Sequence, residues 1–425
     1  MRQKERMMVI SLLVCVSLFF SLSAISLAKT TVVMWGTWDP SITDDPGAKY
    51  VRQMLANFES TRPDIKIEYV ALSHEVIERN FAIASQAENP PDVVHLRRHL
   101  LATHVNLGSL AALNDYYEQK WDNRPQIFPN FMADVTFGNQ IMGIPYFTDT
   151  VLFYYRKDWH DELGLEVART WGELTANAIP LTREVDGKKV WGFGTITSKT
   201  LVTPERWFYF LLPAGGEPIT PPVNGKATYH LDAGVKALQF HVDLANKYKV
   251  MPPGVETSMD DLFLGFSGGV YAQAPMGTWQ MPKLMMSPEW SKVGITRTPI
   301  PQDGKDKIYA GGWVWAMSKQ STLKDAAWEV IESFAGTKGQ VALGKATQGG
   351  NYPISYPALD DAFFKKGYMP LISDYIKEAG ASFPQHAHYK ELLDGLNNAI
   401  QMAIMGVKTS EEALIEAAEA FNSTY

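Results

Sequence analysis

A serine between glycines is the first group in this sequence that could act as a nucleophile. The segment 265–269 (GFSGG) fits the G-x-S-x-G pattern, and Asp360 and His386 follow Ser267 in the order of an α/β-hydrolase triad. In that pattern the serine follows a strand and precedes a helix. Here the apolar spacing predicts a helix before the serine and a strand after it. The sequence therefore favours a glycine-rich turn, and a secreted serine hydrolase using Ser267 is the alternative from the enzyme class.

Histidines stand close together at two places and could bring two imidazoles to one metal ion. His95 and His99 could share one helix face, and His386 and His388 are two residues apart. Neither pair has around it the cysteines or spaced carboxylates that would complete a zinc site. No G-x-x-x-x-G-K-[ST] phosphate loop occurs in the sequence. We therefore expect no metal and no cofactor.

Tryptophan is the more informative residue type. Several of the 12 Trp residues stand beside glycine at the ends of predicted strands, namely Trp35, Trp38, Trp279 and Trp313. Indole rings at strand ends can line a cleft. Their flat apolar faces suit the C–H faces of sugars, whose hydroxyls also need planar donors and acceptors. Each Trp taken singly can equally pack in the core, and for Trp35 we favour the core.

The predicted elements that position these residues alternate between strands and amphipathic helices. The first stretch contains strands at 31–35, 65–71 and 92–94 and helices at 50–60 and 76–86. The second contains helices at 203–212, 233–247 and 259–264 and strands at 271–276, 293–298 and 313–317. The chain ends in helices at 389–405 and 410–421, the last with Ser410 as its N-cap. This alternation predicts βαβ units and a largely parallel sheet.

The first 28 residues have the pattern of a cleaved signal peptide. Arg2, Lys4 and Arg6 precede an uncharged run over 7–28 that ends in Ser-Leu-Ala. The alternatives are a retained membrane anchor and lipid attachment at Cys15. Because Cys15 is the single cysteine, the chain that follows needs no disulfide in an oxidising compartment.

Composition limits the class of protein further. The 425 residues are 46% hydrophobic, which is enough for two or three domains with apolar cores and argues against disorder. The formal net charge of −7 argues against a nucleic-acid partner, because such a surface needs an excess of basic residues. Together with the predicted signal peptide, these observations indicate an exported, acidic, soluble protein.

The order of the motifs resembles family 1 of the extracellular solute-binding proteins, the maltose-binding-like group that serves sugar ABC importers. The resemblance covers essentially the whole chain after residue 28. Its most specific block is GIPYFTDTVLFYYRKDWHDELGL at 143–165. Weaker blocks occur in the order of the family at 91–94 (PDVV), 277–279 (GTW), 310–318 (AGGWVWAMS) and 406–414 (GVKTSEEAL).

This resemblance implies an α/β fold of the periplasmic-binding-protein type (type II), with two lobes, a hinge of crossing segments and a ligand cleft between the lobes. Lobe 1 would hold 29–148 plus 314–358, and lobe 2 would hold 149–313 plus 359–425. The implied function is a monomeric, non-enzymatic periplasmic receptor. It would capture a sugar or oligosaccharide by closure of the cleft and deliver it to the permease of an ABC importer.

The resemblance also implies ligand contacts at matching positions. The loop after the first strand points to Trp38 and Asp39, the crossing block to Asp149, and the G-x-W block to Trp279. A carboxylate such as that of Asp149 can accept hydrogen bonds from neighbouring hydroxyls. The other candidate ligand-binding residues are Glu205, Arg206 and Trp207 before the segment 214–216, and Gly312 and Trp313 at the return crossing.

One segment departs from what a neutral sugar would require. The run 95–99 (HLRRH) is basic, and guanidinium groups bind carboxylates and phosphates well. Arg97 and Arg98 are therefore candidates for binding an anionic sugar, such as a uronide or a sugar phosphate. The alternatives are a surface basic patch, or one arginine that donates hydrogen bonds to sugar hydroxyls.

Overall fold

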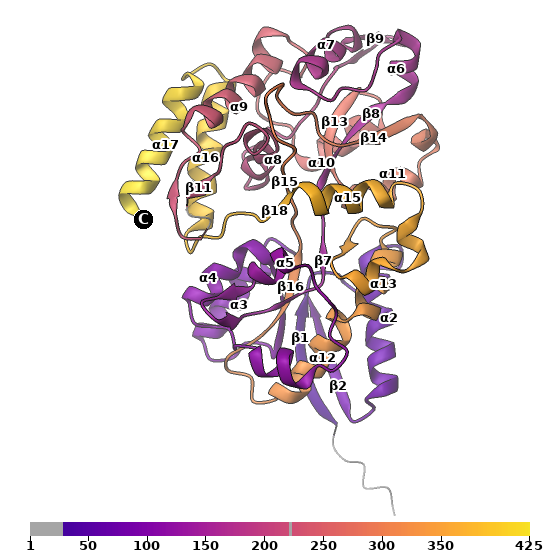
Figure 1. Cartoon of the computed structure of the whole chain (residues 1–425), viewed down its shortest axis with the longest axis vertical. Helices are drawn as coiled ribbons and strands as arrows, with labels where there is room; N and C mark the ends of the chain where they lie inside the picture. The colour runs from indigo at the N-terminus through magenta and orange to yellow at the C-terminus, as the bar shows by residue number, and fades with distance from the viewer. Residues whose placement is uncertain (1–28, 221–222) are drawn as a thin grey trace, which may run out of the picture.

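The computed structural model describes residues 29–220 and 223–425 (Figure 1). The predicted signal peptide and Cys15 lie outside the described residues. Within the described part of the chain, no helix is both long and apolar enough to cross a membrane.

The lower half in Figure 1, here called the first half, is built around a five-stranded sheet. Its strand order is β2 (Ile65–Ala71), β1 (Thr30–Gly36), β3 (Val93–Arg97), β16 (Trp313–Met317) and β6 (Ile144–Pro145). The strands β2, β1 and β3 are parallel, whereas β16 pairs antiparallel with both β3 and β6. The strand β16 therefore joins the sheet from a distant part of the chain and completes the first half.

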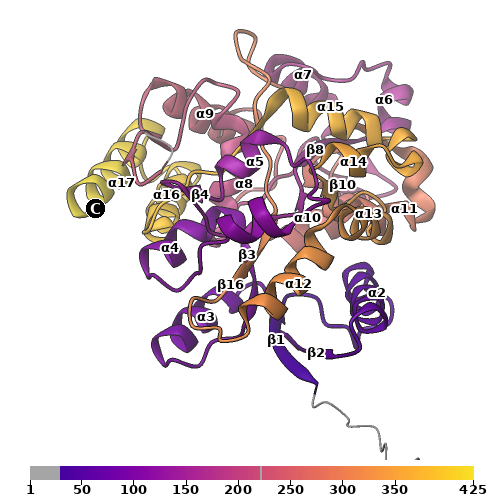
Figure 2. The ribbon, with the colours of Figure 1, turned by 60° about the horizontal axis from the view of Figure 1, so that its bottom comes forward.

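Helices cover this sheet because each presents an apolar stripe to it. In α2 (Pro46–Thr61), Tyr50, Met54 and Phe58 recur every four residues and are buried. The carboxylate of Asp45 caps this helix by accepting a hydrogen bond from the backbone N–H of Ala48 (2.7 Å). Figure 2 shows α2, α3 (Ile77–Gln86) and α12 (Lys324–Ala335) gathered around the sheet. The other helices of the first half are α4 (Leu101–Asn106), α5 (Pro129–Ala133) and α13 (Thr337–Ala346), with the short helix α14 (Tyr356–Leu359) packed on α13.

The upper half in Figure 1, here called the second half, contains a three-stranded sheet. Its order is β13 (Gln273–Gly277), β8 (Val151–Arg156) and β14 (Val293–Thr296), and both pairs are antiparallel. The expectation of a largely parallel sheet is therefore correct for β2, β1 and β3 and wrong for β16 and for the second half. The spacing of strands and helices shows that connections are long, and a long connection permits either strand direction.

The helices of the second half include those predicted at 203–212, 259–264, 389–405 and 410–421. They are α6 (Lys157–Leu163), α7 (Trp171–Leu181), α8 (Val202–Leu211), α9 (Asp232–Val242), α10 (Met259–Ser267), α11 (Met281–Met285), α16 (Tyr389–Ile404) and α17 (Ser410–Thr424). The predicted helix at 233–247 is α9 followed by the π-helical turn η3 (Asp243–Lys247). Short hairpins are β4 (Thr136–Phe137) with β5 (Gln140–Ile141), β9 (Arg183–Val185) with β10 (Lys188–Val190), and β11 (Ile219–Thr220) with β12 (Lys226–Ala227).

The last helix begins with a cap one residue earlier than predicted. Thr409, not Ser410, is the N-cap of α17: its hydroxyl accepts a hydrogen bond from the N–H of Glu412 (3.2 Å). The carboxylate of Glu412 accepts in return from the N–H of Thr409 (3.0 Å), which completes a capping box. The predicted Ser410 cap is wrong because the Thr-x-x-Glu spacing starts at 409, and the Ser410 hydroxyl instead donates to Gln239 (3.1 Å).

The two halves meet where the chain crosses between their sheets. The strands β7 (Phe147–Thr148) and β17 (Tyr352–Pro353) pair antiparallel there. The Thr148 hydroxyl donates to the carbonyl of Gly311 (3.0 Å). Gly312 has φ 121°, and a Cβ there would lie 2.3 Å from the carbonyl oxygen of Phe147, so the crossing needs glycine at 312. The segment that contains Phe147 and Thr148 is thereby held against the segment that contains Gly311 and Gly312.

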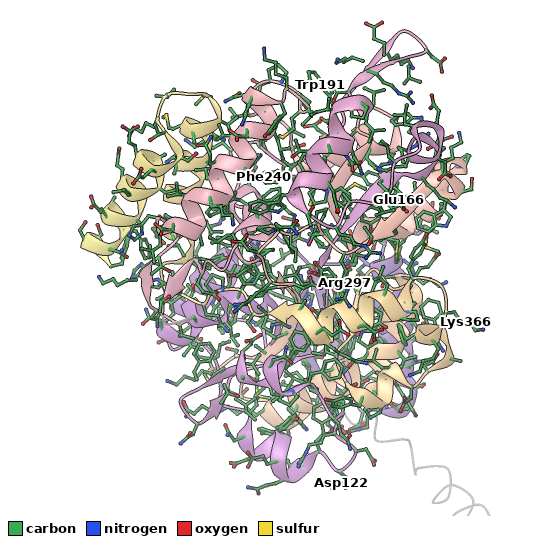
Figure 3. The ribbon with its side chains drawn as sticks, turned by 45° about the horizontal axis from the view of Figure 1, so that its top comes forward. Asp122, Glu166, Trp191, Phe240, Arg297 and Lys366 are labelled. Atoms are coloured by element: carbon green, nitrogen blue, oxygen red, sulfur yellow. The ribbon has the colours of Figure 1, made fainter. Side chains whose placement is uncertain are left out.

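The helix α15 (Met369–Ala379) lies along the junction of the two halves (Figure 1). It leads into β18 (Gly380–Ala381), which pairs with β15 (Ile308–Tyr309). Arg297, labelled near the middle of Figure 3, forms ion pairs with Asp306 (2.6 Å) and with Glu378 on α15 (2.5 Å). These ion pairs hold α15 against the chain that follows β14.

Candidate functional site

The crossing places Asp149 at the junction of the two halves. Its backbone carbonyl accepts a hydrogen bond from the N–H of Gly311 (2.7 Å). Its carboxylate makes no hydrogen bond or ion pair with another of the described residues. Burial raises the pKa of this carboxyl to about 6, although the charges of Arg206 and Arg98 act in the opposite direction. Asp149 is thus a carboxyl group with acceptor capacity that the protein itself does not use.

Arg206 and Trp279 form a wall of the site on the second half. The guanidinium carbon of Arg206, on α8, lies 4.9 Å from the ring centroid of Trp279, which follows β13. Such a cation–π contact keeps the N–H donors of the guanidinium available at its edge. Arg206 is 9% exposed and forms no ion pair with a described carboxylate. The Trp279 ring also packs on Gly277, where a Cβ would lie 2.2 Å from the ring.

Arg98 is buried at the junction and is not part of a surface patch. It is 3% exposed, its Nε lies 2.9 Å from the Asp134 carboxylate, and its Nη2 donates to the carbonyl of Ala310. The guanidinium carbon also lies 4.3 Å from the ring centroid of Phe131. Burial raises the pKa of Asp134, against the opposing charge of Arg98. The surface-patch interpretation is therefore wrong for Arg98.

Arg97 is also paired. Its Nε donates to the Glu78 carboxylate (2.9 Å). Its guanidinium carbon lies 5.9 Å from the ring centroid of Trp313, the first residue of β16. The two arginines of the basic run thus each face a carboxylate of the first half.

The aromatic side chains of the first half cluster around His95. The His95 ring stacks on Trp313 (centroids 4.5 Å apart), and Trp38 lies 5.3 Å from it. Trp38 also lies 5.9 Å from Phe147 of the crossing strand β7. Burial lowers the pKa of His95 well below its ordinary value, and its Nε2 is bonded to the Tyr146 hydroxyl (2.8 Å). His95 is therefore a neutral packing residue behind the half-buried indoles of Trp38 and Trp313.

His99 and Glu205 meet across the junction. Nε2 of His99 lies 3.4 Å from Oε1 of Glu205, and the hydroxyl of Tyr389 donates to the same oxygen (3.2 Å). Burial alone would raise the pKa of Glu205, but His99 and the charges of Arg97 and Arg206 outweigh it, and the pKa is lowered. Glu205 is thus held as a carboxylate.

A narrow crevice lies at this junction, with no room in it for a water molecule. It is lined by side chains or backbone from both halves: Arg98, His99, Asp134, Gly311, Phe383 and Gln385. Five of these were not predicted as site residues: Gly311, which precedes the predicted Gly312, and His99, Asp134, Phe383 and Gln385. His99 and Gly311 each stand beside a predicted residue, which is a signal that the sequence offered, whereas Asp134, Phe383 and Gln385 lie in no motif.

Most of the predicted site residues come together, but two do not. Arg98, Asp149, Glu205, Arg206 and Trp279 surround the junction, with Gly312 in the crossing backbone. Trp38, Trp313 and Arg97 lie beside them on the first half. Trp207 is 1% exposed and packs inside the second half, so the structure does not bring it to the junction. Asp39 lies in the loop after β1, where its carboxylate accepts from the N–H of Ser41 (2.9 Å).

The structure gives Ser267 the surroundings of a turn. It is the last residue of α10, so a helix precedes it and β13 follows, as the apolar spacing predicts. Its hydroxyl is buried and has no hydrogen-bond partner among the described residues, so no base there activates it. The ring of His386 instead contacts Phe421 (5.0 Å).

Histidine pairs do not form metal sites in the part of the chain that the structure describes. No group of three or more His, Cys, Asp or Glu side chains there could hold a metal ion. The expectation that His95 and His99 share a helix face is wrong, because His95 lies in β3 and His99 in the short helix η1 (Arg98–Leu100). The strand extends to residue 97, three residues beyond the predicted end.

Comparison with known structures identifies the fold. The structure of maltose-bound MalE3 from T. maritima matches with a TM-score of 0.80 at 24% identity, over 93% of this chain and 100% of that one. The fold is therefore the two-lobed fold of the periplasmic binding proteins.

Two curated relatives are similar in sequence. A "Probable amino-acid ABC transporter periplasmic-binding protein" from Sinorhizobium fredii is 24% identical over 288 residues, which are 65% of this chain. The match spans 62% of that relative, less than two thirds of its length. A "Mannitol-binding protein" from Pseudomonas aeruginosa is 23% identical over 332 residues, which are 71% of each chain.

A family model decides the assignment. The model described as "Bacterial extracellular solute-binding protein" matches residues 43–341, which is well over half of the chain. This range includes the three-stranded sheet and every strand of the five-stranded sheet except β1. It also includes all the predicted ligand-binding residues except Trp38 and Asp39. The chain therefore belongs to the family of bacterial extracellular solute-binding proteins.

Proposed function

We propose that this protein is the receptor of an ABC importer and binds a neutral polyhydroxylated solute, a sugar or polyol, between its lobes. Membership of the solute-binding family supports the receptor role. The names of similar proteins include maltose and mannitol as ligands, which supports this class of solute. The role is one of binding and delivery, without catalysis.

The pairing of charges at the junction carries the choice of a neutral solute. Arg97 and Arg98 already face Glu78 and Asp134, so the basic run offers no spare positive charge for a carboxylate or phosphate. Arg206 forms no ion pair within the described part of the chain, but its charge already acts on the carboxyl of Asp149. An anionic ligand would therefore place two negative charges beside one positive charge in a poorly solvated site. A neutral solute adds none.

Asp149 and Arg206 supply complementary hydrogen bonding for such a solute. The Asp149 carboxylate can accept hydrogen bonds from hydroxyls, and the Arg206 guanidinium can donate to hydroxyl oxygens. Neighbouring hydroxyls on a sugar or polyol act both as donors and as acceptors, so one solute can satisfy both groups. The indoles of Trp38, Trp279 and Trp313 provide apolar surface for its C–H groups.

The placement of the sheets supports the predicted division into lobes. Lobe 1 (29–148 plus 314–358) would contain the five-stranded sheet, except that the first residue of β16 falls at the boundary. Lobe 2 (149–313 plus 359–425) would contain the three-stranded sheet. A solute that contacts both lobes would favour their closed arrangement by its higher affinity for it. We further propose export by a cleaved signal peptide at 1–28, a periplasmic location, a monomeric receptor and docking on a membrane permease.

A thermal-shift screen tests this proposal. The chain from Lys29 onward is heated with neutral monosaccharides, oligosaccharides, polyols, uronides and sugar phosphates. A solute that binds only the folded protein at 100 times its Kd raises the free energy of unfolding by about 2.7 kcal/mol. We expect a neutral sugar or polyol to raise the melting temperature. If only anionic solutes raise the melting temperature, the ligand is anionic and not neutral. If no solute raises the melting temperature of the folded protein, the proposal is refuted.

A further inference from the structure

His99 of the first half enters a socket on the second half. The side chain is 8% exposed, and its ring centroid lies 5.0 Å from that of Phe383 and 5.1 Å from that of Tyr389. The third side of the socket is Glu205, whose Oε1 lies 3.4 Å from Nε2 of His99. One imidazole is thus enclosed by two aromatic rings and a carboxylate that belong to the opposite half.

The socket is held in place by contacts within the second half. The Tyr389 hydroxyl, at the start of α16, donates to Glu205 on α8 (3.2 Å). The Phe383 ring stacks on that of Tyr309 in β15, with centroids 4.3 Å apart and an interplanar angle of 13°. The socket is therefore positioned by contacts that do not involve His99.

Two further contacts join the halves along the same side. Gln385 donates from Nε2 to the carbonyl of Asp134 (2.6 Å), and the Thr103 hydroxyl donates to the carbonyl of Ala387 (3.3 Å). On the second half, the donor Gln385 and the acceptor Ala387 both lie in the segment 383–389, which leads from β18 into α16. In Figure 1 this segment faces α4 and α5 of the first half. One short segment therefore carries a line of contacts between the halves.

We propose that this line of contacts, with His99 and Glu205 at its centre, is a latch that favours the closed arrangement of the lobes independently of solute. The contacts join protein to protein, so they contribute to closure whatever the cleft contains. The proposal rests on the proposed function in one respect, namely that the lobes open and close.

The latch gives Glu205 a role different from that of Asp149. Oε1 of Glu205 is occupied by Tyr389 and His99, whereas the carboxylate of Asp149 has no partner among the described residues. Glu205 is thus a positioning residue for the lobes, and Asp149 is the carboxylate that faces the solute. The latch also sets affinity, because the apparent Kd falls as the closed fraction of the free protein rises.

The experiment measures the distance between the lobes in buffer, with no solute added. The chain from Lys29 contains no cysteine, so Asn106→Cys on α4 and Glu419→Cys on α17 give two labelling sites on exposed residues. Pulsed electron paramagnetic resonance on the spin-labelled protein then reports the fractions of closed and open molecules. Glu205→Gln and His99→Ala are compared with Glu391→Gln, an exposed residue of α16 with the same loss of charge.

We expect the latched protein and the Glu391→Gln control to populate the closed distance. His99→Ala removes the imidazole that packs on Phe383 and Tyr389 and faces Glu205, and Glu205→Gln removes the charge that faces the imidazole. Each is expected to lower the ratio of closed to open molecules about tenfold, because a buried carboxylate loses its partner or its charge. The double variant should open the lobes no further than the stronger single variant, because both remove one contact. A distance distribution unchanged in the variants, or an open distance in the unmodified protein, would overturn the latch.

Gln385→Ala keeps the test decisive if a socket variant fails to fold. This variant removes the hydrogen bond to the carbonyl of Asp134 and leaves His99, Glu205, Phe383 and Tyr389 in place. We therefore expect it to lower the ratio of closed to open molecules as well, but by less than the socket variants do. Circular dichroism identifies folded variants. Because no solute is present, failure of the latch and failure of sugar binding are separate results.

Discussion

Replacing Asp149 by asparagine should stabilise the fold while weakening solute binding. The Asp149 carboxyl has its pKa raised from 3.8 to about 6 by burial. Each tenfold change in proton affinity corresponds to about 1.4 kcal/mol, so ionising this group in the folded protein costs about 3 kcal/mol. Asparagine keeps the shape without the charge, although its amide also loses hydration. We therefore expect a gain of roughly 1–3 kcal/mol in the free energy of unfolding at pH 7.5.

The pH dependence identifies the cause of this gain. Below pH about 3.8 the carboxyl is protonated in both the folded and the unfolded chain, and ionisation costs nothing. Between pH 3.8 and about 6 the unfolded chain releases the proton and the folded chain keeps it, so the cost grows with pH. Above pH about 6 the folded group is ionised as well and the cost stays constant. The advantage of Asp149→Asn should therefore appear between these two values and level off above them.

Urea unfolding from pH 4 to pH 8 measures this difference. The control is Asp44→Asn, which changes an exposed aspartate and should leave the free energy of unfolding within about 0.5 kcal/mol at each pH. An Asp149→Asn variant that is less stable than the unmodified protein at pH 7.5, or whose advantage does not depend on pH, would refute the reasoning. A less stable variant would mean that the Asp149 carboxylate is hydrogen-bonded within the protein and contributes to its stability.

Three other substitutions test separate parts of the structure. Arg98→Met leaves Asp134 as a buried carboxylate without its partner and should lower the free energy of unfolding by about 3–5 kcal/mol in urea; a loss below 1 kcal/mol would show that the pair is solvated. Trp279→Ala removes the ring beneath Arg206 and should weaken solute binding by about 1–3 kcal/mol in titration calorimetry, whereas unchanged affinity would remove Trp279 from the site. Thr409→Ala removes the cap of α17 and should cost about 1 kcal/mol in urea, with unchanged stability contradicting the capping box.

Local patterns predicted much of the fold. The strands at 65–71 and 313–317 have the predicted bounds, and the helices at 76–86 and 389–405 differ from the predicted ones by one residue each. These elements carry their own period of apolar residues, so their type is set by neighbouring residues. The direction of β16 and of the second sheet was wrong, because the period of a strand contains no information on which way its partner runs.

The candidate site was predictable only in part. Asp149 and Trp279 stand in blocks that resemble a known family, and their neighbourhood follows from the crossing of the chain. The pairing of Arg98 with Asp134 was not predictable, because Asp134 stands in no motif and their ion pair depends on packing. The contact of His99 with Phe383 joins segments from opposite halves of the fold, and no local pattern records it.

Titration calorimetry with matched solutes tests the central claim most directly. The chain from Lys29 is titrated with the neutral sugar or polyol that gives the largest thermal shift and with its anionic counterpart, for example glucose and glucuronate or mannitol and mannitol phosphate. The structure predicts one site per chain, tighter binding of the neutral member of each pair, and loss of that binding in Asp149→Asn. Tighter binding of the anionic member, unchanged by Asp149→Asn, would contradict a cleft built for a neutral solute.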